Sequence, residues 1–345
     1  MAKIKKIINN PLFNILIVIV ITYLVYILLL APNMNDIILA FQQANPYLII
    51  LCILLGLLSV VMGGVALSAY AKLFNPKFTI KAGSEACFIG AMAGGIMPFG
   101  SGTQVFQFYV FRKYDTESAD AVSILFIDFI VYQATMIVTI LSLILLRFSK
   151  FTSVSNWFWL VILGFLVNSF ILLALVLIAK SNRVHHFVTN KLINVFHRFK
   201  IVQDKQQAIH NMNDQIEKFR LATSVLSNNR KALGIGVISN FMRLMITHSL
   251  PYFIAVALGI HLEFKQLIDI IALSAFTAQL NAFFPSPGAT GGTEVVFKSM
   301  FENIFLHMTL GVLVIWRFVT YYFIVIVGAL VFIGVRKFKI NEREK

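Results

Sequence analysis

Six runs of about 20 apolar residues limit the possible folds of this chain more than any other feature. They occupy residues 12–31, 47–71, 119–146, 157–179, 232–260 and 309–335. A helix of that length crosses a hydrocarbon core of about 30 Å and satisfies its own backbone polar groups there. With only 13% charged residues, the chain is also too apolar for a water-soluble globule. The runs predict an all-α polytopic membrane protein with about six full transmembrane helices, forming one integral membrane domain over residues 1–345.

The net charge of +14 is unevenly distributed along this pattern. Most of the Lys and Arg residues precede the first run, follow the second, fill the segment 180–231 or lie at the C-terminus. The opposite connections carry only Arg147, Lys150 and Lys265. Because basic loops remain on the cytoplasmic side, we expect both termini in the cytoplasm of a bacterial cell. This orientation requires segments 82–112 and 265–307 each to return to the side from which they start.

Both returning segments contain a cluster of Gly and Pro between apolar flanks, at 93–102 and 285–292. Such clusters interrupt helices, and irregular backbone at membrane depth is tolerated only inside protein or beside a wet cavity. We therefore expect a re-entrant hairpin from the cytoplasmic side at 82–112 and another from the outer side at 265–307. The residues expected to keep the broken backbone open are Pro98, Gly100, Gly102, Pro285, Pro287, Gly288, Gly291 and Gly292.

The two clusters also resemble each other. Gly102-Thr103-Gln104 aligns with Gly292-Thr293-Glu294 about 190 residues later, and the two predicted hairpins have opposite orientations. This is typical of inverted-repeat transporters with broken helices near the midplane. The alternative is a chance match between two glycine-rich loops.

The segment 181–230 is basic and has apolar residues three or four apart. This pattern is typical of an amphipathic helix. It either lies on the surface of an anionic membrane or forms an ordinary solvated linker. Its histidines lack the spacing of a zinc site, and we expect the thiols of Cys52 and Cys87 to be buried and inert.

Ionisable residues inside apolar runs are costly and mark candidate functional sites. Those expected at membrane depth are Asp128, Arg243, Glu294, Lys298 and Arg317. If the two acids neutralise two of Arg112, Arg243 and Arg317, one guanidinium remains to bind a phosphate. Structural ion pairs are the alternative. Neutral hydrogen bonds to a headgroup, or bridges between helices, are expected from Gln104, Gln107, Gln133, Gln279 and Asn281.

Several catalytic signatures are absent from the sequence. It contains no Walker A loop, His-Glu-x-x-His, Gly-x-Ser-x-Gly or Cys-x-x-Cys. We therefore expect no catalytic residue, no metal, no cofactor and no nucleic-acid partner.

The motifs resemble those of the flippase-like membrane domain of the lysylphosphatidylglycerol synthase family, nearly from end to end. The segment from Phe284 to Glu294 is similar to the family's Pro-x-Pro-Gly-Gly-x-Gly-x-x-Glu motif, and 316–322 is similar to its final Arg-x-x-Thr-Tyr, which ends at Tyr321. The segment 94–100 with Arg112 is similar to the first family motif. Two departures are an extra residue around Ala289-Thr290 and Gln104 where many members have Glu.

The resemblance implies a translocase that moves an anionic or aminoacylated phospholipid, or a lipid-linked sugar, between leaflets. The resemblance and the intramembrane polar residues together suggest these substrate-binding residues: Gln104, Arg112, Asp128, Arg243, Glu294, Arg317 and Tyr321. Longer members carry a soluble domain that joins lysine to phosphatidylglycerol, so a separate lipid-modifying synthase is an expected partner, and a homodimer is possible. The alternatives are a phosphatidylglycerol lysyltransferase or another lipid-modifying transferase, and a non-transporting partner of an envelope lipid synthase.

Overall fold

All regular elements of the described chain are helices. The computed structural model describes residues 34–151, 158–180, 205–281 and 283–343, with Tyr23, Ile27, Ala31 and Lys191 as isolated positions. The all-α prediction is confirmed for these residues. The predicted first crossing, 12–31, and most of 181–204 lie outside them.

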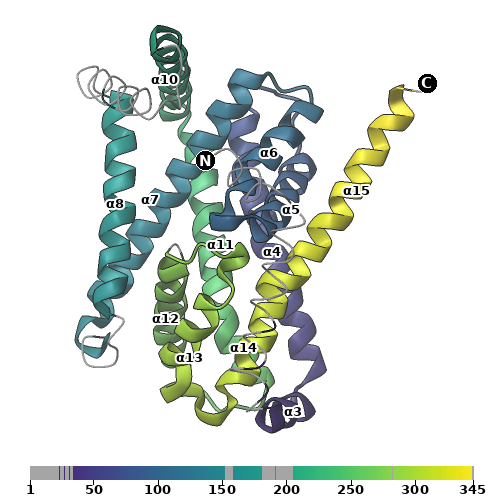
Figure 1. Ribbon diagram of the computed structural model, residues 1–345, viewed down its shortest axis with the longest axis vertical. Coiled ribbons are helices and arrows are strands. Elements are labelled where there is room, and N and C mark those ends of the chain that lie inside the picture. Colours follow the sequence, from purple (N-terminus) through teal and green to yellow (C-terminus); the bar gives the residue numbers. More distant parts are fainter. Residues whose placement is uncertain are drawn as a thin grey trace.

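The first described helix, α3, lies at the lower end of Figure 1, and the last, α15, runs to its upper right. They are α3 (Met34–Gln43), α4 (Pro46–Ala71), α5 (Ile80–Ile96), α6 (Gly102–Lys113), α7 (Ser118–Phe151), α8 (Phe158–Lys180), α10 (Lys205–Asn228), α11 (Arg230–Ala257), α12 (Gln266–Asn281), α13 (Gly292–Phe305), α14 (Thr309–Arg317) and α15 (Phe323–Arg343). Short 3₁₀ turns interrupt them at η3 (Pro98–Gly100), η4 (Pro287–Ala289) and η5 (Leu306–Met308), and a π-helical turn, η6 (Phe318–Tyr322), joins α14 to α15.

Three helical stretches of the described chain are long and apolar enough to cross a membrane. They are Pro46–Ala71, Ser118–Leu146 and the run Pro287–Val335, which α13, α14 and α15 share; α8 adds a shorter apolar stretch, Trp159–Ala174. The membrane class follows from these lengths. The count of six crossings stays a prediction.

The centre of the molecule is the pair α4 and α11, which pack along each other (Figure 1). Each helix begins at an asparagine whose side chain caps the first turn: Asn45 accepts from Tyr47 and Leu48, and Asn229 accepts from Ala232. The helices approach closely, because a Cβ on Gly236 of α11 would lie 1.8 Å from the Tyr70 hydroxyl of α4.

Two helical hairpins flank this pair from opposite ends. The hairpin α5–α6 occupies the upper half of Figure 1 and α12–α13 the lower half, and each lies in its own apolar core cluster. Their tips meet between the two ends of the molecule, where η3 packs against η4, although no residue of η3 is buried and Phe99 is 69% exposed. The tips therefore bring together two chain segments about 190 residues apart.

The two tips have the same backbone conformation. After Pro98, Phe99 and Gly100 adopt left-handed angles, with φ of 54° and 66°. After Pro287, Gly288 and Ala289 do the same, with φ of 59° and 51°. Two consecutive left-handed residues are uncommon, so their recurrence after a proline in both tips supports the internal repeat.

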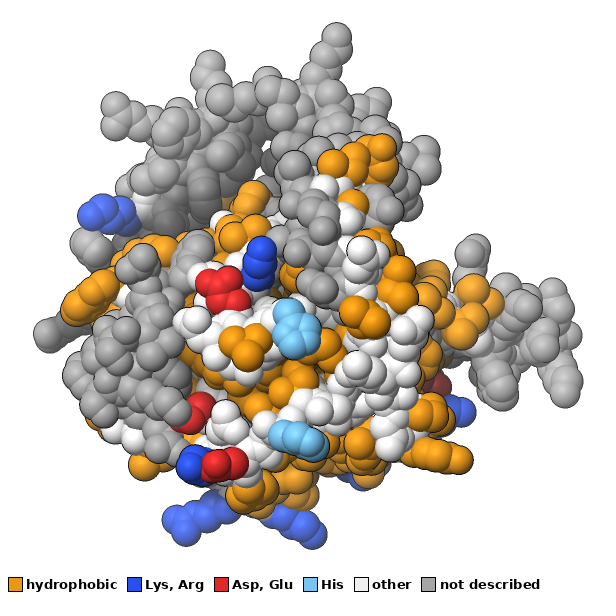
Figure 2. Space-filling model, turned by 90° about the horizontal axis from the view of Figure 1, so that it is seen from below, with side chains coloured by type: hydrophobic (Ala, Val, Ile, Leu, Met, Phe, Trp, Pro, Cys, Tyr) orange, Lys and Arg blue, Asp and Glu red, His pale blue; other side chains and the backbone are white. Residues whose placement is uncertain are grey.

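The two ends of the molecule differ in charge. Figure 2 views the lower end, where charged side chains are few and scattered among apolar and uncharged groups. Lys265 at this end is neutralised by Glu263 at 2.5 Å. The upper end carries the basic residues Lys72, Lys77 and Lys81 around the start of α5, and Arg112 and Lys113 at the end of α6.

Candidate functional site

The tip of the lower hairpin is fixed by a buried ion pair. Glu294, in the first turn of α13, and Arg317, at the end of α14, are 4% and 6% exposed. The Arg317 Nε donates to Glu294 Oε1 at 2.6 Å. The second carboxylate oxygen accepts from the backbone N–H of Gly291 at 2.6 Å. Glu294 therefore neutralises the arginine and also caps its own helix.

The same guanidinium holds the irregular turn. Arg317 Nη2 donates to the carbonyl of Gly288 at 3.2 Å and to the hydroxyl of Thr290 at 3.3 Å. Thr290 in turn donates to the carbonyl of Pro287 at 2.9 Å. These bonds satisfy backbone groups that a broken helix would leave unpaired in an apolar interior. The arrangement fits the alternative of a structural ion pair.

Tyr321 in η6 connects the two hairpins. Its ring packs on the Arg317 guanidinium, with 4.7 Å from Cζ to the ring centroid. Its hydroxyl donates to the carbonyl of Gly95, near the end of α5, at 3.1 Å. A Cβ on Gly288 would lie 2.3 Å from the tyrosine ring, and Gly288 has a φ of +59°, so this position requires glycine for both space and conformation.

The remaining predicted loop residues line the two tips. Pro98 begins η3, and Gly100 and Gly102 lead into α6. Pro285 and Pro287 precede the lower turn, and Gly291 and Gly292 start α13. The structure thus places this predicted set in the tips of the two hairpins, of which η3 and η4 are in contact.

Arg243 and Asp128 form a second polar cluster between α4, α7 and α11. The Arg243 guanidinium packs against the backbone of α4 at Gly63, where a Cβ would lie 3.0 Å from Nη1, and its Cζ is 5.0 Å from the centroid of the Tyr132 ring. Asp128 lies within electrostatic range of it. Neither makes a salt bridge in the described part of the chain, and Asp128 Oδ1 is buried there without a hydrogen-bond partner.

Of the three candidate arginines, Arg243 is therefore the one whose guanidinium has neither an ion pair nor a hydrogen bond among the described residues. Arg112 is exposed at the end of α6 and donates to the carbonyl of Thr116 at 2.7 Å. Arg317 is occupied by Glu294 and the lower tip. Lys298 on α13 is half-buried and has no ion pair among the described residues.

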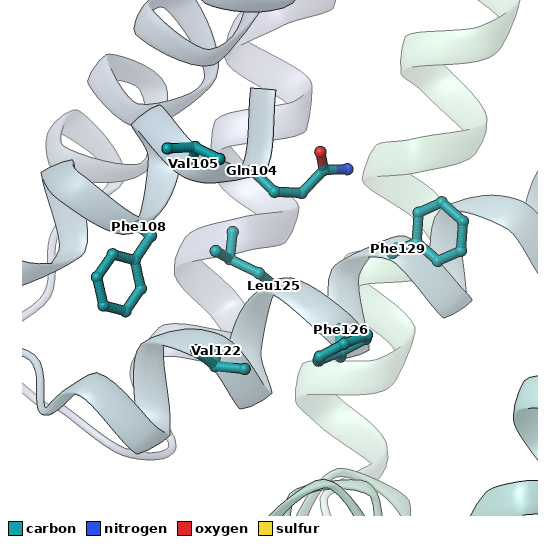
Figure 3. A pocket seen from close by; sticks show the side chains of 7 residues that line it. All are labelled: Gln104, Val105, Phe108, Val122, Leu125, Phe126 and Phe129. Carbon is teal, nitrogen blue, oxygen red and sulfur yellow. The ribbon is translucent and has the colours of Figure 1, made fainter. Parts of the chain in front are cut away.

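Gln104 lies at the edge of an apolar cleft of about 530 Å³ between α6 and α7 (Figure 3). The other lining residues are Val105, Phe108, Val122, Leu125, Phe126 and Phe129. Gln104 is exposed, unlike its counterpart Glu294 in the lower hairpin. The cleft offers an apolar surface beside a single neutral polar group.

The other amides bridge helices. Gln133 of α7 donates to Asn168 of α8 at 3.1 Å, and Asn168 donates to Gln279 of α12 at 2.6 Å. Asn281 accepts from Thr293 at 2.9 Å and so ties the two arms of the lower hairpin. Such bridges fit the packing role of intramembrane amides.

Sequence reasoning missed Thr290, Gly95 and Tyr132, all of which contact a candidate side chain. Thr290 was detectable as a hydroxyl in a turn next to buried charges. Gly95 acts through its carbonyl and Tyr132 through its ring face, for which no local sequence signal exists. Cys52 and Cys87 are buried and unpaired, as expected. No group of three or more His, Cys, Asp or Glu in the described ranges is placed to hold a metal ion.

Comparison with known proteins identifies a family. A protein-family model, described as the lysylphosphatidylglycerol synthase TM region, matches residues 13–328. This range covers both hairpins, the Glu294–Arg317 pair and the Arg243 cluster. A search of curated proteins finds no match to the chain. The match extends over most of the 345 residues and connects the chain to membrane lipids. The chain belongs to the family of the lysylphosphatidylglycerol synthase TM region.

Proposed function

We propose that the protein is a flippase that moves a phospholipid between the two leaflets of the bacterial cell membrane. The observation that carries the proposal is the meeting of two broken hairpins, which approach from opposite ends and touch tip to tip between the two ends of the molecule. Broken helices that meet at the midplane are typical of transporters with inverted repeats. Membership in a lipid-related membrane family supports a lipid as the substrate.

The headgroup is assigned to the Arg243 cluster. A guanidinium without an ion pair suits the phosphate that all candidate phospholipids share. Asp128, with a buried oxygen that has no protein partner in the described chain, suits an amine such as that of an aminoacylated headgroup. An intramembrane site that holds both a cation and an acid favours a headgroup that carries both a negative and a positive charge.

The acyl chains are assigned to the cleft between α6 and α7. Its lining is apolar except for Gln104, and its α7 wall belongs to a helix long enough to cross the membrane. A translocating lipid has to keep its chains in an apolar environment while its headgroup passes through protein. The Glu294–Arg317 pair and Tyr321 are assigned to holding the lower hairpin in place.

The orientation follows from charge. The upper end, with the lysines of the loop before α5 and of the end of α6, is assigned to the cytoplasm, together with both termini. The α5–α6 hairpin then enters from the cytoplasmic side and α12–α13 from the outside.

The test is leaflet exchange in proteoliposomes that contain phosphatidylglycerol, lysyl-phosphatidylglycerol or a glycosyl-diacylglycerol, followed with an impermeant reagent. We expect accelerated exchange of a phosphate-bearing lipid and a loss of at least about tenfold in Arg243→Gln, because a charge-assisted contact is removed. Arg230→Gln is the matched control and should retain exchange, since Arg230 is exposed at the start of α11 and is not a candidate site residue.

Two outcomes would contradict the proposal. The first is no exchange of any lipid by folded protein. The second is equal exchange by wild type and Arg243→Gln, which would remove the headgroup assignment. Incorporation of labelled lysine into lipid by the purified protein would instead support the lysyltransferase alternative.

A further inference from the structure

A further cavity lies away from both polar clusters, at the upper end of the molecule. It has a volume of about 980 Å³ and opens between the loop before α5, the first turns of α5, the end of α6 and the later part of α15. Ligand pockets of small molecules fall in the same size range. None of its lining residues was predicted from the sequence to belong to a functional site.

The rim of this cavity is basic. Lys77 of the loop, Lys81 of α5 and Lys113 of α6 all line it, although they come from three separate segments. Lys77 is exposed and has no ion pair among the described residues. Lys81 is 80% exposed and lies 4.0 Å from Glu85, at the limit of a salt bridge. Two ammonium groups are therefore available at the opening.

Two acids, Glu85 and Asp115, also line this cavity, and Glu85 is bonded to another side chain. The Tyr114 hydroxyl donates to the carboxylate of Glu85. Burial, and then the bond to Glu85, raise the pKa of Tyr114, so the phenol stays a neutral donor. Glu85 is thus held on the wall, and its pairing with Lys81 remains loose.

The loop that carries Lys77 is braced against the rest of the cavity. The Asn75 side chain donates to the Tyr114 carbonyl at 3.0 Å and accepts from the backbone N–H of Lys77 at 3.2 Å. Phe78 stacks on Phe111 of α6, with ring centroids 4.8 Å apart. The position of Lys77 is therefore set before any ligand binds, which lowers the entropic cost of binding.

The floor of the cavity is apolar and continues along the contact between α5 and α15. Phe88 and Val331 belong to the lining. Below them the two helices pack closely, since a Cβ on Gly328 would lie 2.4 Å from the Phe88 carbonyl. The same contact leads to Gly95 and Tyr321 at the hairpin junction. From Glu85 to Gly95 the helix rises about 15 Å, at 1.5 Å per residue.

We propose that this cavity binds the phosphodiester of a phospholipid from the leaflet at the upper end, through Lys77 and Lys81, with the acyl chains against the apolar floor. A basic rim over an apolar floor fits a phospholipid better than a free anion, because it matches both halves of the molecule. The role of this site in loading the translocation path rests on the proposed function. The binding itself does not.

The test measures binding of dihexanoyl-phosphatidylglycerol to the full-length protein in detergent, by calorimetry, with glycerol phosphate and inorganic phosphate as competitors. The variant is Lys77→Gln with Lys81→Gln. Its matched control is Lys72→Gln with Lys231→Gln, which removes the same charge from exposed positions that do not line the cavity. Equal thermal denaturation midpoints establish that all forms are folded.

We expect the lipid to bind about tenfold more weakly to the Lys77/Lys81 variant and within about twofold of wild type to the control. Unchanged affinity in the Lys77/Lys81 variant would overturn the site. Equal affinity for the lipid and for glycerol phosphate would overturn its assignment to a phospholipid. Lipid binding by protein that exchanges no lipid in proteoliposomes would contradict the proposed flippase and leave this site intact.

Discussion

The two hairpins share a backbone design and differ in how firmly their tips are held. In both, a proline is followed by two left-handed residues and then by a helix that begins Gly-Thr. The lower helix α13 has Glu294 in its first turn, buried and bonded to Arg317 and to Gly291. The upper helix α6 has Gln104 at the equivalent position, exposed beside an open cleft, and its N-terminal residue Ser101 makes no side-chain cap.

This difference teaches that a repeated backbone does not imply a repeated function. The spacing from Gln104 to Asp128 is close to that from Glu294 to Arg317. Glu294 and Arg317 form a salt bridge, whereas the corresponding positions in the first repeat hold an amide and an acid, between which no salt bridge is possible. We infer that the lower hairpin is the fixed element and the upper hairpin the one able to move.

The largest expected effect concerns the buried pair. Glu294→Ala leaves the Arg317 guanidinium without its counter-charge in an apolar interior, so we expect a loss of about 3–5 kcal/mol in the free energy of unfolding. Gln104→Ala, the equivalent change in the upper hairpin, should cost less than about 0.5 kcal/mol. Thermal denaturation of the solubilised protein, followed by tryptophan fluorescence, measures both. Similar losses in the two variants would contradict the difference between the hairpins.

The next effect concerns the tip glycines. Gly288→Ala places a Cβ at 2.3 Å from the Tyr321 ring at a φ of +59°, and we expect a cost of about 2–4 kcal/mol from strain and overpacking together. Gly100→Ala has a φ of +66° but no atom within 4 Å of the added Cβ, so only the strain of about 1–2 kcal/mol applies. The same denaturation assay compares them. A Gly100→Ala variant that is the less stable of the two would refute the packing account.

A smaller effect concerns the link between the hairpins. Tyr321→Phe removes the hydroxyl that donates to Gly95 and keeps the ring on Arg317, so we expect a loss of about 1 kcal/mol. Amide hydrogen exchange at the end of α5 should become faster. Tyr322→Phe is the control, because the Tyr322 hydroxyl has no hydrogen bond among the described residues. Unchanged exchange in Tyr321→Phe would show that the link is not needed.

The smallest effect comes from making the upper hairpin resemble the lower one. Gln104→Glu adds a carboxylate to the first turn of α6, where the helix dipole stabilises it by about 0.3–1 kcal/mol. Among the described residues no arginine lines the cleft beside Gln104, so the gain should stay within this range. A gain of several kcal/mol, measured by the same denaturation assay, would mean that a cation does reach the upper tip.

Much of the fold could be predicted from the sequence because its causes are local. The Gly/Pro clusters at 93–102 and 285–292 break helices wherever they occur, and the structure breaks both there. Asn45 and Asn229 begin the central helices, although the predicted spans gave no role to these caps. The predicted amphipathic segment 181–230 is helical from Lys205 to Asn228 in its described part.

The pairing of charges could not be predicted in the same way. Two acids and three arginines allow several pairings that differ little in electrostatic energy until their positions are known. The structure joins Glu294 to Arg317, leaves Arg243 facing Tyr132, and places Arg112 at an exposed helix end.

The sequence by itself determined the helical membrane class, the positions of the two breaks and the basic character of one set of loops, because apolar length, proline, glycine and charge act over a few neighbouring residues. Only the tertiary structure decided which arginine has neither an ion pair nor a hydrogen bond among the described residues, which tip contains the buried ion pair and where three lysines line a cavity. Those properties depend on distances between segments that lie 20 to 220 residues apart, and such distances exist only once the helices have packed.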